Sequence, residues 1–171
     1  MAVVAVKSTV VTNNTSTPRV QNSFGLENGR VIRAINANVA IANGDSATST
    51  YRFGKIRSGD YVDRIRMISA DIGTTTAMDV GLYDVLQHTN GGAVVDADFF
   101  ASAVSLSGGA IDSDVTFEAA AAGGLYTNSE KRVWESLGLT ADPHKEYDVV
   151  GTLTGAADAA GTVTLRVYVV R

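Results

Sequence analysis

The sequence has no cysteine, only two prolines and two histidines among its 171 residues, and few aromatic residues, at 7%. The absence of cysteine excludes disulfide bonds, thiolate metal ligands and a cysteine nucleophile, so packing alone is expected to hold the fold together. No stretch approaches the ~20 consecutive apolar residues of a membrane-spanning helix. Repeats of about 20 to 50 residues, which are typical of solenoids and propellers, are also missing.

A large excess of charge of either sign is missing as well. The chain carries 14 basic and 18 acidic residues, for a formal net charge of -4, which argues against nucleic acid and anionic membranes as partners. Residues 1–7 are apolar only up to Lys7, a run too short for the core of a signal peptide. We therefore expect the protein to be made and kept in the cytoplasm until it is assembled or released.

The sequence does have segments of alternating hydrophobicity. Residues 162–170 show the period of two that a half-buried strand needs, and residues 147–154 follow the same pattern. Small residues at 155–161 separate the two segments, which predicts a final hairpin. The alternating apolar residues of the last segment are Val163, Leu165, Val167 and Val169.

Four further strands are predicted, at residues 31–41, 48–56, 61–72 and 75–82. In residues 61–72 the apolar positions change parity, so either both faces are covered or a bulge switches them. Many short strands separated by glycine-rich breaks favour an all-β fold, an antiparallel β-sandwich of roughly eight strands and jelly-roll type. The length and a hydrophobic content of 45% suit one folded domain with its own core.

Two short helices are expected between the strands. Asp96 has the character of an N-cap for a helix that presents Phe99, Phe100, Ala103 and Val104 on one side. For the second helix, Thr127 and Glu130 have the spacing of a capping box. Its apolar stripe consists of Val133, Trp134 and Leu137, and it ends at Gly138. We expect Trp134 to close one end of the core.

No group of residues has the spacing of a catalytic or metal site. His88 and His144 are far apart and have no local partner of ligand type. Two Asp-X-Asp motifs, at residues 96–98 and 112–114, lack the loop glycine and the next oxygen ligand of an EF-hand. The sequence therefore predicts a protein that is not an enzyme, with no catalytic residue, no metal and no cofactor.

Basic residues gather around the predicted turn at residues 58–60. Such a cluster forms either a patch that meets an acidic partner surface or a solvated strand face with local ion pairs to Asp60, Asp63 and Asp71. The second explanation is the simpler one. The basic residues of the cluster are Arg52, Lys55, Arg57, Arg64 and Arg66.

Six segments of the chain resemble segments of the capsid cement or decoration proteins of tailed bacteriophages. These segments are Tyr-Arg-Phe-Gly-Lys-Ile at 51–56, Asp-Arg-Ile-Arg-Met-Ile at 63–68, Met-Asp-Val-Gly-Leu-Tyr-Asp at 78–84, Val-Trp-Glu-Ser-Leu-Gly-Leu-Thr-Ala-Asp-Pro at 133–143, Tyr-Asp-Val-Val-Gly-Thr-Leu-Thr at 147–154 and Ala-Gly-Thr-Val-Thr-Leu-Arg-Val-Tyr at 160–168. The resemblance covers residues 51–171. It rests on strand patterns and not on reactive residues.

This resemblance implies a jelly-roll protein of the virion that binds the outer surface of the phage head and stabilises the lattice of the major capsid protein. It implies a homotrimer or homodimer whose partners are the major capsid protein and other copies of itself. A different class of function remains open, a receptor- or carbohydrate-binding module associated with a head or tail fibre. That module would use exposed aromatic residues, for which Tyr61, Tyr83, Tyr126 and Tyr168 are available.

We divide the chain into an extended N-terminal arm, residues 1–22, and a single β-sandwich domain, residues 23–171. Three alternatives remain open for the arm. It binds a neighbouring subunit by adding to a sheet edge, it forms the first strand of its own sheet, or it is a frayed terminus. The residues expected to bind partners are Val3, Val4, Val6, Val10 and Val11 of the arm, together with Arg52, Lys55 and Arg57.

Overall fold

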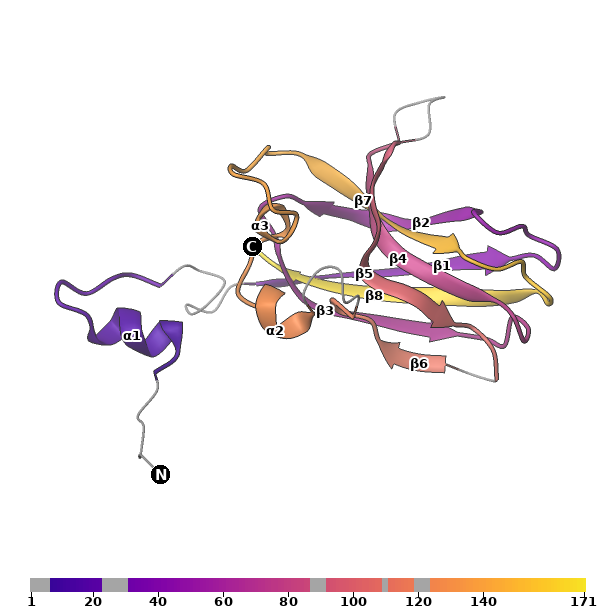
Figure 1. Ribbon diagram of the computed structural model, residues 1–171, viewed down its shortest axis with the longest axis horizontal. Helices are drawn as coiled ribbons and strands as arrows, with labels where there is room; N and C mark the ends of the chain where they lie inside the picture. The colour runs from indigo at the N-terminus through magenta and orange to yellow at the C-terminus, as the bar shows by residue number, and fades with distance from the viewer. Residues whose placement is uncertain (1–6, 23–30, 87–91, 109–110, 119–123) are drawn as a thin grey trace.

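The computed structural model describes residues 7–22, 31–86, 92–108, 111–118 and 124–171. Within these residues eight strands form two antiparallel sheets of four strands each, which pack face to face (Figure 1). One sheet has the order β1 (Ile32–Ile41), β8 (Gly161–Val170), β3 (Tyr61–Ser69) and β6 (Ile111–Asp114). The other has the order β2 (Thr50–Arg57), β7 (Glu146–Leu153), β4 (Ala77–Asp84) and β5 (Val94–Ser105).

These strand orders, 1-8-3-6 and 2-7-4-5, are those of a jelly roll, which confirms the predicted fold class. The chain changes sheet at every connection between consecutive strands except β4 to β5. The final two strands follow this rule, because β7 and β8 belong to different sheets. The predicted hairpin is therefore wrong: the small residues at 155–161 carry the chain across the sandwich instead of joining two paired strands.

The core lies between the two inner faces. Val163, Leu165 and Val167 of β8 are at most 1% exposed, and Met78 and Val80 of β4 are fully buried in the facing sheet. Burying each of these side chains stabilises the fold by about 1.5–3 kcal/mol. Period-two alternation is thus enough to place both strands, as the sequence predicts. Three aromatic rings pack edge to face or tilted within the same core, those of Phe99, Phe100 and Phe117.

A bulge accounts for the change of parity in β3. The register of β3 against β8 shifts between Val62 and Arg64, so that Val62 and Ile65 are both buried although they lie three residues apart. An extra residue in one strand turns the following side chains to the opposite face. This is one of the two solutions that the sequence predicted for residues 61–72.

The helix predicted to follow Asp96 is wrong, because these residues belong to β5. β5 pairs with β4, and its register shifts at three places. These irregularities bury the consecutive Phe99 and Phe100 together, which imitates the spacing of an apolar helix face. Gly81 of β4 allows this arrangement, because a side chain at that position would meet the backbone of residues 96 and 97.

The second predicted helix is broken into two short pieces. Two helical turns, α2 (Leu125–Asn128) and α3 (Val133–Ser136), replace it. The backbone N–H of Arg132 donates to the Glu135 carboxylate at 2.7 Å, so this pair caps α3 instead of Thr127 and Glu130. Gly138 follows α3 with a φ of 73°, as expected of a C-terminal glycine. Val133, 1% exposed, enters the core, whereas Trp134 is half-buried.

The N-terminal arm contains a helix, α1 (Thr9–Thr15), where extended chain was expected. The Ser8 hydroxyl accepts from the backbone N–H of Val11 and caps the helix. Asn22 folds back and its side chain accepts from the Asn13 amide at 2.8 Å. These short-range polar contacts outweigh the β preference of the valines. Figure 1 shows α1 apart from the two sheets.

The described helices contain four to seven residues. None of them is long and apolar enough to span a membrane.

Candidate interaction site

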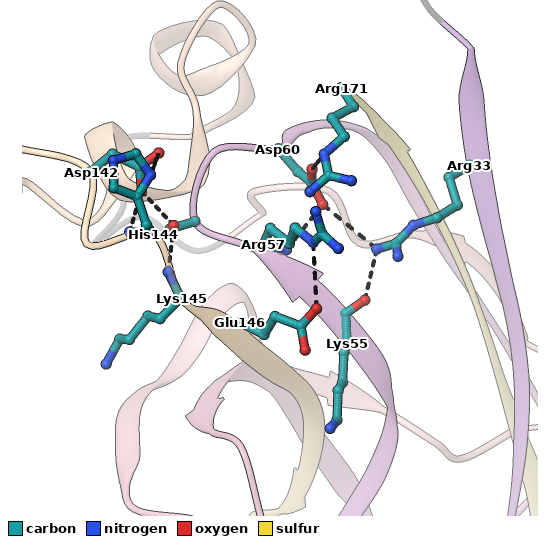
Figure 2. A network of polar contacts seen from close by, with 10 residues as sticks. Arg33, Lys55, Arg57, Asp60, Asp142, His144, Lys145, Glu146 and Arg171 are labelled. Carbon is teal, nitrogen blue, oxygen red and sulfur yellow. Dashed lines mark hydrogen bonds and ion pairs between the residues drawn. The ribbon is translucent and has the colours of Figure 1, made fainter.

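One end of the sandwich collects charged side chains from four strand ends and the adjacent loops. β1 begins there with Arg33, β2 ends there with Lys55 and Arg57, β7 begins after Lys145, and Arg171 follows β8. The turn from β2 to β3 and the chain before β7 supply the remaining members (Figure 2). We call this surface the polar end; its residues are Arg33, Lys55, Arg57, Asp60, Asp142, His144, Lys145, Glu146 and Arg171.

The polar end is locally basic although the chain is acidic. Its five Lys or Arg side chains stand against three carboxylates of its own and against Asp84, which pairs with Lys145, whereas the formal net charge of the chain is -4. A hollow of about 400 Å³ opens between the turn at residues 57–60 and residues 142–146. An acidic surface is therefore the partner that this site fits by charge.

Asp60 is the buried centre of the polar end. Its side chain is 3% exposed and accepts a hydrogen bond from the backbone N–H of Arg57 at 3.0 Å. Arg33 Nη2 lies 3.6 Å away and Arg171 Nε 3.8 Å away. A buried carboxylate is stable only where positive charges and hydrogen-bond donors offset its lost hydration. Through these contacts Asp60 joins the first and last strands of the domain to the turn after β2.

A second carboxylate organises the chain before β7. Asp142 accepts from the Ser58 hydroxyl and, at 2.8 Å, from the backbone N–H of His144. Burial would raise the pKa of Asp142, but these two hydrogen bonds and the nearby His144 and Arg132 outweigh it and lower the pKa. The His144 ring is 86% exposed, which matches the surface role expected of it; His88 lies outside the described residues.

Lys145 points away from Asp142 toward the end of β4, which pairs with β7 in the same sheet. Its ammonium donates to Asp84 at 2.7 Å and lies 4.8 Å from the centre of the Tyr147 ring. The hydrogen bond to Asp84 is the main cause that raises the pKa of Lys145. Lys55 is exposed like Lys145 but differs from it in forming no ion pair with any described residue.

The basic cluster predicted from the sequence does not form one patch. Arg64 and Arg66 lie on β3 and point outward from one sheet, whereas Arg52, Lys55 and Arg57 belong to β2 of the other sheet. The expected local pairs are also wrong. The carboxylates that pair with the arginines come from distant strands: Asp148 for Arg52, Glu146 for Arg57, Asp114 for Arg64 and Asp112 for Arg66.

Arg52 is the most deeply placed residue of the cluster. Its Nη1 lies 2.6 Å from Asp148 Oδ2, and the two side chains are 24% and 5% exposed. The guanidinium also lies over the Tyr83 ring, and the backbone N–H of Leu86 donates to Asp148 at 3.1 Å. Of the three β2 residues expected to bind partners, Lys55 and Arg57 are the exposed ones.

The Asp-X-Asp motifs lie in strands instead of loops. Asp112 and Asp114 on β6 pair with the arginines of β3. Asp96 on β5 lines an apolar hollow of about 690 Å³, where burial, followed by its contact with Asp98, raises its pKa. Among the described residues no group of His, Asp or Glu side chains has an arrangement that could hold a metal ion.

The valines of the arm are only partly described. Val10 is half-buried and Val11 is 43% exposed on α1. Val3, Val4 and Val6 lie outside the described residues. Several hydrogen bonds join residues 7–22 to one another, for example Lys7 to Thr15 and Arg19 to Asn14.

Sequence reasoning found Lys55 and Arg57 and named Asp60 as a local partner, but it missed Arg33 and Arg171 as members of one site. No local sequence pattern predicts this group of residues, because the group depends on the register of strands more than a hundred residues apart, such as Ile32 opposite Val170. The tyrosines were also misjudged as a set. Tyr61 and Tyr83 are 6% and 5% exposed, so both are buried.

No protein-family model matches the sequence, and no curated protein matches it. Among solved structures, the fold is similar to a chain of the cyanophage Pam1 capsid asymmetric unit, with a TM-score of 0.54 and 13% identity over 91% of this chain and 96% of that chain. It is also similar to a chain of the capsid of Ralstonia phage GP4, with a TM-score of 0.52 and 14% identity over 82% and 84% of the two chains. At these identities the likeness shows a shared β-sandwich fold.

Proposed function

We propose that the protein is a structural component of a bacteriophage virion and, more narrowly, a cement or decoration protein that binds the outer surface of the head and stabilises the lattice of the major capsid protein. The observation that carries the proposal is the fold shared with chains from two phage capsids. The likeness extends over most of each of those chains, so it is not a likeness to a fragment of a much larger subunit.

The physical basis of such a role is linkage. A protein that binds only the assembled shell adds its binding free energy to the shell alone. Many copies multiply a modest contact at each site. Such a role needs no catalysis. The ion pairs and hydrogen bonds around Asp60 and Asp142 provide a rigid surface for it.

Two parts of the chain are proposed to contact the capsid. The first is residues 1–22, which carry Val10 and Val11 on a helix that lies apart from the sandwich (Figure 1). The second is the exposed basic part of the polar end, Lys55 and Arg57, which suits an acidic patch on the major capsid protein. Neither nucleic acid nor a membrane is proposed as a partner.

The alternative, a fibre-associated receptor- or carbohydrate-binding module, loses support from the placement of its tyrosines. Tyr61 and Tyr83 are buried, Tyr168 is half-buried, and only Tyr126 is widely exposed, at 87%. An aromatic binding surface built on these four residues is therefore not available.

The proposal is tested by sedimenting the purified protein with capsid shells that lack it. We expect the full chain to sediment with shells, deletion of residues 2–22 to abolish this binding, and Lys55→Glu to weaken it. Lys131→Glu is the matched control, because Lys131 is an exposed lysine outside the polar end. Circular dichroism checks that each variant is folded.

The outcomes separate the parts of the proposal. If the variant that lacks residues 2–22 binds shells as strongly as the full chain does, the arm is not the contact. If Lys55→Glu and Lys131→Glu behave alike, the polar end is not the contact. A full-length protein that never sediments with shells contradicts the cement role itself.

A further inference from the structure

The four edge strands of the sandwich are not equally protected against pairing with another chain. An edge strand exposes backbone N–H and C=O groups, and proteins usually blunt it by short length, bulges or charge. β6 has only four residues and carries Asp112 and Asp114. β5 has three shifts of register. β2 has a bulge between Arg52 and Gly54 and carries three basic residues.

β1 has none of these features. Its ten residues pair with β8 without any shift of register, and its other edge pairs with no described strand. Arg33, at its beginning, is its only charged residue. Val31 and Ile32 at the same end are 85% and 53% exposed. A long, regular and nearly uncharged edge of this kind is a template for strand addition.

The side chains on the outer face of β1 are small and can pair with themselves. Ala34, Asn36, Asn38 and Ala40 are all exposed and alternate with the inward-facing Ile35, Ala37 and Val39. A side-chain amide both donates and accepts hydrogen bonds, so asparagine is complementary to a second asparagine. This surface needs no partner of opposite charge, and a second copy of the same strand satisfies it.

We infer that β1 pairs antiparallel with β1 of a second copy, about a two-fold axis that passes through Asn36. In this register Asn36 faces Asn36 of the second copy, Asn38 faces Ala34, and Ile32 faces Ala40 and becomes covered. The two four-stranded sheets then join into one continuous sheet. The contact is isologous, as two-fold dimers require.

Charge on the neighbouring edge is compatible with this arrangement. Lys55 and Arg57 lie at one end of β2 and Thr50 lies at the other. A two-fold axis places the basic end of β2 in one copy beside the Thr50 end of β2 in the other, so like charges are kept apart. Arg33 donates to the Lys55 carbonyl at 2.8 Å and thereby ties the beginning of β1 to β2 of its own copy.

The inference is tested first by the mass of the protein in solution, measured by sedimentation equilibrium over a range of concentrations. We expect the full chain to form a dimer. Asn38→Lys, which places a charge at the seam, is expected to raise the dissociation constant roughly tenfold or more. Thr162→Lys is the matched control, because Thr162 is exposed on the same face but lies on β8, one strand in from the edge.

The register is tested by single cysteines, since the chain contains none of its own. Across the proposed axis two cysteines at position 36 have the separation of a disulfide, whereas two at position 38 lie several residues apart. Oxidation is expected to link the Asn36→Cys variant and to leave Asn38→Cys and Thr162→Cys unlinked. These variants remain informative even if Asn38→Lys fails to fold.

Several results would overturn the inference. A monomeric full chain at every concentration would do so, and so would a dimer that Asn38→Lys leaves unchanged. Equal linking at positions 36, 38 and 162 would indicate random collision. A dimer lost on deletion of residues 2–22 but kept in Asn38→Lys would assign the contact to the N-terminal arm.

Discussion

At the scale of single residues, the clearest stabilising contact outside the core is the ion pair between Arg52 and Asp148. Both residues lie on the outer face of their sheet, yet Asp148 is only 5% exposed because Leu86 and Tyr83 pack around the pair. The Arg57–Glu146 pair joins the same two strands, but its side chains are 47% and 45% exposed. The two pairs therefore differ in burial and not in the strands they connect.

Asp148→Ala is expected to lower the free energy of unfolding by about 3 kcal/mol, because it leaves the Arg52 guanidinium without its buried partner. Glu146→Ala is the matched control, for which a change below about 1 kcal/mol is expected of an exposed pair. Urea denaturation followed by circular dichroism measures both. Equal effects of the two substitutions would show that burial does not distinguish these pairs.

The contact between Tyr51 and Asp45 makes a prediction about pH. Burial is the main cause that raises the pKa of Tyr51 to about 12, and its hydrogen bond to Asp45 at 2.6 Å adds to the shift. The ordinary value is 10.0. The unfolded chain therefore loses this proton first as the pH rises.

The contribution of neutral Tyr51 to the free energy of unfolding is fully present below pH 10 and is lost as the pH rises toward about 12. We expect the difference in unfolding free energy between the natural protein and Tyr51→Phe to be constant from pH 7 to 9 and to shrink above pH 10. Comparison with Tyr51→Phe removes the contribution of the other tyrosines. A difference that stays constant up to pH 11.5 would contradict the raised pKa.

At the scale of elements, Gly81 shows how one small residue decides the path of a strand. A side chain at this position would lie 2.2–2.3 Å from the backbone of residues 96 and 97, which cross the outer face of β4. Gly59 has no such neighbour: the only nearby atom is an oxygen of the Asp142 side chain, at 3.0 Å.

Gly81→Ala is accordingly expected to destabilise the protein by roughly 2 kcal/mol or more, because backbone must move to make room. Gly59→Ala is expected to have a much smaller effect, since a side chain can shift. Thermal unfolding of both variants measures the difference. A Gly81→Ala protein as stable as the natural one would show that β5 does not cross β4 as described.

The sequence predicts elements well where one inner face alternates without interruption. Met78 and Val80 of β4 and the valines of β8 follow period two, and both strands lie where expected. β5 was not predicted as a strand, because its bulges bury Phe99 beside Phe100, a spacing that also suits a helix. The incorrect prediction of a final hairpin has a similar cause. Alternating hydrophobicity indicates that β7 and β8 are strands, but it does not indicate which sheet each strand joins.

The polar end was predictable only in part for the same reason. Lys55 and Arg57 are adjacent to a turn and stand out as a basic cluster. Asp60 and Arg171 meet only because β3 and β8 pair, with Tyr61 opposite Val170. Long-range register is set by the packing of the whole core, and single-sequence patterns do not contain it.

At the scale of the whole molecule, the chain is one jelly roll whose strands change sheet at nearly every connection, with an N-terminal segment that lies apart from it (Figure 1). The fold supplies a rigid body, the polar end offers a locally basic surface, and β1 offers an open edge. Each of these features suits a protein that acts by contact with other subunits.

The proposed role is tested most directly by the number of copies of this chain in purified phage particles, measured by quantitative mass spectrometry against the major capsid protein. A cement protein is expected to be present in many copies, in a simple ratio to the major capsid protein. A handful of copies per particle would place the protein in the tail or fibres, and its absence from particles would contradict a role in the virion.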